Sequence, residues 1–128
     1  MKKFLSFMSV VVLGLALLVG IAHAATSQAL LTTTMYDAVS TPIGLNKTAS
    51  FSANNHSGSP RAVYAIVKRQ RQGTGVWYET YSTLMQPGTP AGFSNMSDNN
   101  GSLCLWTLQL NPYGIGTTGC NAVGSINY

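Results

Sequence analysis

The chain has 128 residues, only 8% of which are charged, and its formal net charge is +4. That length suffices for one domain. Lys2 and Lys3 precede an apolar run, and beyond them five cations and three carboxylates leave 5 − 3 = +2. So weak a basic character argues against nucleic-acid binding, which relies on a clustered basic surface.

The first residues have the three-part layout of a secretory signal peptide. A basic head is followed by the apolar residues 4–21 and then by Ala22-His23-Ala24. An apolar run of about 20 residues can also remain as a membrane anchor, but small residues directly before a polar stretch favour cleavage after Ala24. The sequence therefore predicts a helical signal peptide at 1–24 and a single secreted, extracellular β domain at 25–128, with no stable membrane insertion after cleavage.

The first half of the domain predicts three strands. Residues 28–36 and 47–53 alternate apolar with polar side chains, which is typical of strands with one buried face. Residues 62–67 are apolar on both faces before the chain turns basic, which indicates a strand in the middle of a sheet. The Asn/Ser/Gly-rich residues 54–60 between them read as a loop.

The second half predicts a hairpin and further short strands. The glycine-containing residues 72–75 connect to a strand at 76–85, which ends at two prolines. A weak strand at 91–95 precedes the turn residues 98–101. Residues 103–110 alternate most clearly, and a last short strand is expected at 122–126.

Six or seven short strands in about 100 residues predict an all-β domain, either a small antiparallel β-sandwich or a small barrel. The strand count resembles that of immunoglobulin-like modules. The spacing of Cys, Trp and a distant second Cys in that fold is absent, because Trp106 follows Cys104 by two residues.

Cys104 and Cys120 are the only cysteines, and an even number of cysteines in an exported chain predicts a disulfide bond. If Asn-Pro-Tyr-Gly at 111–114 forms a tight type I turn, the two cysteines face each other on neighbouring strands. If the loop extends to Gly119, they do not. We expect the first arrangement, and the bond would then stabilise the domain by about 3 kcal/mol.

The sequence does not indicate an enzyme, a metal site or a cofactor. His56 with a neighbouring serine and Asp37 or Asp98 can be drawn as a triad, but such pairings arise by chance in a serine-rich chain, and the G-x-S-x-G motif is missing. Glu79 and Asp98 could be the two carboxylates of a glycosidase, yet nothing in the sequence fixes their separation. Four glycosylation sequons begin at Asn46, Asn55, Asn95 and Asn100.

Aromatic and basic residues of the central hairpin form the candidate binding patch, and the best-supported function is a non-catalytic surface, matrix or ligand-binding module. The sequence does not identify its partner, and we expect a protein or a carbohydrate at the cell surface. An exposed edge strand would also allow self-assembly. Two alternatives are a secreted antibacterial protein, similar to a bacteriocin, and a small inhibitor of extracellular enzymes. The patch residues are Lys68, Arg69, Arg71, Trp77 and Tyr81.

Overall fold

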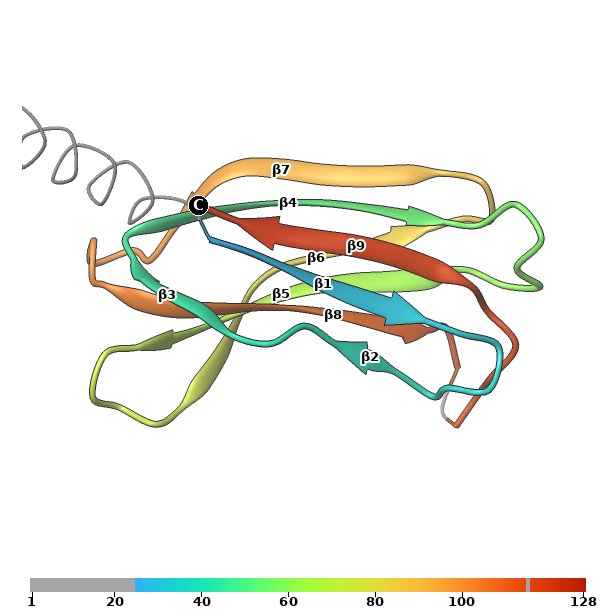
Figure 1. Ribbon diagram of the computed structural model, residues 1–128, viewed down its shortest axis with the longest axis horizontal. Coiled ribbons are helices and arrows are strands. Elements are labelled where there is room, and N and C mark those ends of the chain that lie inside the picture. Colours follow the sequence, from blue (N-terminus) through green and yellow to red (C-terminus); the bar gives the residue numbers. More distant parts are fainter. Residues whose placement is uncertain (1–24, 115) are drawn as a thin grey trace, which may run out of the picture.

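Two antiparallel sheets pack face to face in the computed structural model, which describes residues 25–114 and 116–128 (Figure 1). The predicted signal peptide at 1–24 lies outside these residues. The first sheet has the order β1-β9-β4-β7, and the second has the order β2-β8-β5-β6, with β3 also paired to β8. The strands are β1 (Thr26–Leu31), β2 (Ala38–Val39), β3 (Ile43–Asn46), β4 (Thr48–Asn55), β5 (Val63–Arg71), β6 (Trp77–Met85), β7 (Pro90–Ser97), β8 (Cys104–Pro112) and β9 (Ala122–Asn127).

The predicted all-β sandwich is therefore confirmed for the described part of the chain. The strand predicted at 62–67 corresponds to β5, which lies between β8 and β6 as expected. The strand predicted at 28–36 is shorter: β1 ends at Leu31, and the backbone N–H of Met35 donates to the carbonyl of Thr32 in a turn. Within the described residues, no helix is long and apolar enough to cross a membrane.

The core follows from strand alternation. Trp106, Leu108 and Leu110 of β8 are fully buried, and they meet Val63 and Val67 of β5 in one apolar cluster. Burying each large aliphatic side chain contributes about 1.5–3 kcal/mol. The alternate residues of the same two strands must then project from the outer face of the second sheet.

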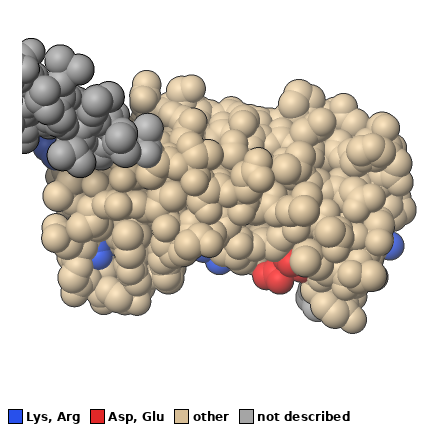
Figure 2. All heavy atoms as spheres, in the orientation of Figure 1, with Lys and Arg blue, Asp and Glu red and all other residues tan. Residues whose placement is uncertain are grey.

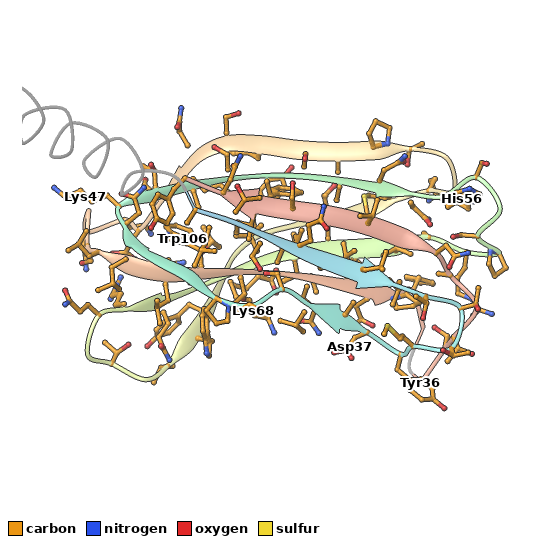
Figure 3. The ribbon with its side chains drawn as sticks, in the orientation of Figure 1. Tyr36, Asp37, Lys47, His56, Lys68 and Trp106 are labelled. Atoms are coloured by element: carbon orange, nitrogen blue, oxygen red, sulfur yellow. The ribbon has the colours of Figure 1, made fainter. Side chains whose placement is uncertain are left out.

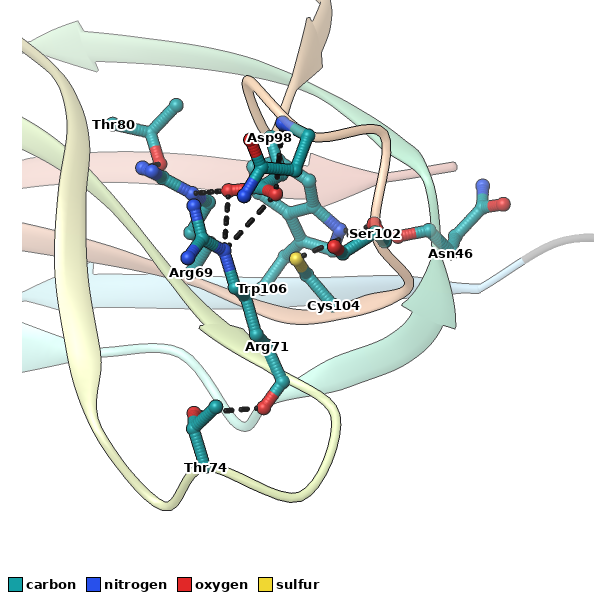
Figure 4. A network of polar contacts seen from close by, with 10 residues as sticks. Asn46, Arg69, Arg71, Thr74, Thr80, Asp98, Ser102, Cys104 and Trp106 are labelled. Carbon is teal, nitrogen blue, oxygen red and sulfur yellow. Dashed lines mark hydrogen bonds and ion pairs between the residues drawn. The ribbon is translucent and has the colours of Figure 1, made fainter.

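The two sheets are also joined at one end by an ion cluster around the buried carboxylate of Asp98 (Figure 4). Asp98, which follows β7 of the first sheet, accepts hydrogen bonds from Arg69 Nε at 2.6 Å and from Arg71 Nε at 3.0 Å, both on β5 of the second sheet. The Asp98 side chain has no exposed surface. Burial opposes its ionisation, but these bonds and one from the backbone N–H of Asn100 outweigh it, so the pKa of Asp98 lies well below its ordinary value.

At the other end of the sandwich, Asn55 of β4 forms a second polar link between the sheets. Its Nδ2 donates to the carbonyl oxygens of Arg61 at 3.1 Å and Met85 at 3.0 Å. Asn55 is fully buried, so its sequon is not accessible in the folded protein. The carbonyls that it binds lie just before β5 and at the end of β6, so the link ties β4 to the second sheet.

The predicted disulfide bond is absent, and both cysteines are free and buried. Cys104 pairs with Arg71 at the end of β5, whereas Cys120 Sγ lies 3.7 Å from the carbonyl of Arg61, just before β5 begins. The eight residue steps from 63 to 71 separate these two places by roughly 26 Å, whereas a disulfide needs Cα atoms within about 7 Å. The prediction was wrong because β8 and β9 do not form a hairpin: they belong to different sheets.

We expect labelling to show this directly. Iodoacetamide added in denaturant without reductant should modify both cysteines, and the folded protein should resist modification because both thiols are buried. Burial, with the negative charge of Asp98, also raises the pKa of the Cys104 thiol, which keeps it in the unreactive protonated form. Intact mass spectrometry measures the number of labels, and a chain that accepts none before reduction would contradict the free-thiol structure.

The ion cluster makes the stability of the domain sensitive to acid. Because the pKa of Asp98 is lower in the folded than in the unfolded chain, its contribution to the free energy of unfolding is present at neutral pH. This contribution declines as the pH falls below about 4, the pKa of an unfolded aspartate.

Asp98→Asn should therefore destabilise the protein clearly at pH 7 and progressively less toward pH 2, as measured by urea unfolding. Asp37→Asn, which changes an exposed carboxylate, is the control. Equal stability of Asp98→Asn and the unmodified protein at pH 7 would refute this role.

Candidate binding face

The outer face of the second sheet gathers aromatic and polar side chains along β5 and β8. Tyr64 pairs with Asn111, and Lys68 pairs with Thr107, so these residues form two rows across the two strands. Ile66 and Gln109 form the row between them. In Figure 3, Asp37 and Tyr36 lie beyond Lys68 along the same side of the molecule.

A tyrosine cleft of about 720 Å³ lies at one end of this face. Its walls are Tyr36, Asp37, Tyr64, Asn111 and Tyr113, together with the turn that follows β8. The rings of Tyr64 and Tyr113 are 6.0 Å apart and tilted by 39°, whereas Tyr36 and Tyr113 are each more than half exposed. Three aromatic rings are therefore available to a ligand in the cleft.

Local hydrogen bonds position the cleft residues. The backbone N–H of Tyr113 donates to the carbonyl of Ala62 at 2.9 Å, which fixes the turn after β8 beside the start of β5. Gln109 Nε2 donates to Asp37 Oδ2 at 3.1 Å, which links the segment after β1 to β8. The exposed carboxylate of Asp37 and the amide of Asn111 supply acceptors and a donor at the cleft.

A tryptophan cavity of about 290 Å³ lies further along the same face. Trp77 and Val39 flank it with exposed apolar surface, and Lys68, Thr107 and Gln109 supply its polar groups. Ser40 holds the segment after β2 in place, because its backbone N–H donates to the carbonyl of Leu108 and its hydroxyl accepts from the Leu108 N–H.

The structure divides the candidate patch that the sequence predicted. Lys68 and Trp77 come together in the tryptophan cavity. Arg69 and Arg71 are held by Asp98 in the ion cluster. Tyr81 packs against the core, with its ring 5.6 Å from that of Phe51 and 5.0 Å from that of Phe93.

His56 and Asp98, which the sequence suggested as partners in a triad, are not brought together either. His56 follows β4 and accepts a hydrogen bond from Gly58 through Nδ1, whereas Asp98 lies beyond Ser97, which pairs with Thr48 at the opposite end of β4. Among the residues that the structure describes, no three His, Cys, Asp or Glu side chains form a group that could hold a metal ion.

Sequence reasoning missed the tyrosine cleft. Tyr36, Tyr64 and Tyr113 are far apart in the chain, and two of them lie in connections rather than in strands. The available signals were the Tyr36-Asp37 pair and the Asn-Pro-Tyr-Gly turn, but only the strand order shows that they meet.

Comparison with known proteins gives a fold and no family. No family model matches the sequence, and no curated protein sequence matches it. The crystal structure of PirA is similar over 83% of this chain and 94% of its own, with a TM-score of 0.51 and 9% identity. A Yersinia pseudotuberculosis-derived mitogen (YPM) is similar over 82% of this chain and 84% of its own, with a TM-score of 0.47 and 14% identity. The likeness to PirA supports the sandwich fold alone.

Proposed function

We propose that this protein is a non-catalytic extracellular binding module whose tyrosine cleft holds a neutral saccharide. The observation that carries the proposal is the meeting of three tyrosine rings from separate parts of the chain around one cavity, beside a carboxylate and an amide. Export, which the proposal requires, rests on the signal peptide predicted from the sequence.

The chemistry of the cleft suits a sugar. A pyranose ring presents C–H groups on its faces and hydroxyls around its rim, so it can lie against aromatic rings while polar side chains bind its edge. Asp37 can accept hydrogen bonds from hydroxyls, and Asn111 can both donate and accept. The cavity volume lies within the range of ordinary small-molecule sites, about 300–1,000 Å³.

The charge distribution favours a neutral ligand. Among the residues that line the tyrosine cleft, Asp37 is the charged one, and charged side chains are sparse on the view in Figure 2. A strongly anionic ligand would be repelled by that carboxylate. Glycosidic hydrolysis uses a pair of carboxylates, and the cleft lining contributes one, which supports binding without catalysis.

The two alternative functions have weaker support. A small inhibitor of extracellular enzymes would need an exposed loop that a disulfide holds rigid, such as residues 111–119, but Cys104 and Cys120 are not bonded. An antibacterial action through charge would need exposed cations. Of the five cations of the domain, Arg69 is largely buried and Arg71 is partly buried, and both are paired with Asp98.

Removing cleft tyrosines tests the proposal. The mature protein should bind members of a panel of neutral malto-, cello- and chito-oligosaccharides, measured by isothermal titration calorimetry. Tyr36→Ala and Tyr113→Ala should each weaken that binding by about tenfold, because a stacking surface is lost. Tyr78→Ala is the matched control, since Tyr78 is exposed but lies outside the cleft, under the Arg69 guanidinium.

Two other results would contradict the proposal or change the ligand. A protein that binds none of these saccharides, or whose cleft variants bind as well as the control, would refute the proposal. Binding of choline in place of every saccharide would show instead that the tyrosines form a cage for a quaternary ammonium group.

A further inference from the structure

We infer that the tyrosine cleft and the tryptophan cavity are two subsites of one extended face, and that the ligand is therefore a saccharide chain rather than a single sugar. This inference rests on the proposed function and adds to it the length of the ligand and a second contact residue, Trp77.

Gln109 joins the two sites physically. Its Nε2 donates to Asp37 Oδ2 in the tyrosine cleft, and its side chain also lines the tryptophan cavity. A ligand that leaves the cleft along β8 meets Gln109 first and then the tryptophan cavity, which the buried Thr107 also helps to line. Gln109 is thus the polar side chain that connects the two sites.

The spacing of the two sites suits an oligosaccharide. The row of Tyr64 and Asn111 lies four residue steps from the row of Lys68 and Thr107, which is roughly 13 Å along the strands. Trp77 lies one row further, because it pairs with Gln70 on β5. A monosaccharide cannot span this distance, whereas a short oligosaccharide can touch the rings at both ends.

The second site offers the same type of contacts as the first. Trp77 is 37% exposed and Val39 is 56% exposed, so they present apolar surface at the rim of the cavity. Lys68 and Gln109 provide hydrogen-bonding groups beside them. Tyr64 and Asn111 of the first site and Lys68 and Thr107 of the second lie on two strands of one hydrogen-bonded sheet, so this part of the two sites is held at a fixed spacing.

Chain length is the variable to test. Within one saccharide series, affinity should rise by about tenfold or more between the monosaccharide and the hexasaccharide, as the second site becomes occupied. Trp77→Ala should remove this rise while leaving the affinity for the shortest ligand unchanged. Tyr113→Ala should weaken binding at every length. Tyr78→Ala, which changes the next residue of β6 on the opposite face, should behave like the unmodified protein.

The two tryptophans provide an independent readout. The indole N–H resonance of Trp77 should shift with the long ligand and not with the monosaccharide. The resonance of Trp106, which is buried and donates to the carbonyl of Asn46, is the internal control.

Each outcome of these titrations decides a separate point. Binding that depends on Tyr113 but not on chain length or on Trp77 would overturn the two-subsite inference and leave the proposed function intact. Absence of binding at every length would overturn both.

Discussion

The arrangement of the second sheet depends on the ion cluster of Asp98 with Arg69 and Arg71. Taking two guanidinium groups out of water at the end of a sandwich costs free energy unless an anion pairs with them. Asp98 supplies this anion from the end of a strand of the other sheet. With the two arginines fixed inward, alternation along β5 places Lys68 and Gln70 outward. Of the three cations of β5, only Lys68 therefore lies on the outer face. The other side chains of the candidate binding face are largely aromatic rings and amides.

The link through Asn55 has a matching effect at the opposite end. It ties β4 to the carbonyl before β5 and to the end of β6, close to where Tyr64 and Tyr113 begin the binding face. β5 is therefore held to the first sheet near both of its ends, by a charged contact and by an amide contact. A strand fixed in this way restricts the positions of its outer side chains, which would lower the entropy lost if the proposed ligand binds there.

The sequence predicted strongly alternating strands well and contacts between distant segments poorly. Residues 47–53 and 103–110 revealed β4 and β8 because each buries one face in the core. β2 and β3 were missed because they have two and four residues around Ser40 and Pro42, too few for a period to show. The disulfide was predicted wrongly because a tight turn at 111–114 was expected to place Cys104 and Cys120 on neighbouring strands, whereas the chain crosses there to the other sheet. Arg69 and Arg71 were predicted to belong to the candidate binding patch, because no residue near them in the sequence indicates that Asp98 is their partner.

The position of the tyrosine cleft explains why the fold alone does not reveal a ligand. Tyr36 lies in the connection from β1 to β2 and Tyr113 in the connection from β8 to β9, and both connections cross between the sheets at the same end of the sandwich (Figure 1). The backbone N–H of Gly119 donates to the carbonyl of Thr33, which holds these connections against each other. Residues in such connections can change while the core is retained. Two sandwiches as similar in shape as this chain and PirA can therefore carry unrelated sites, because the crossing segments, and not the sheets, determine which side chains meet there.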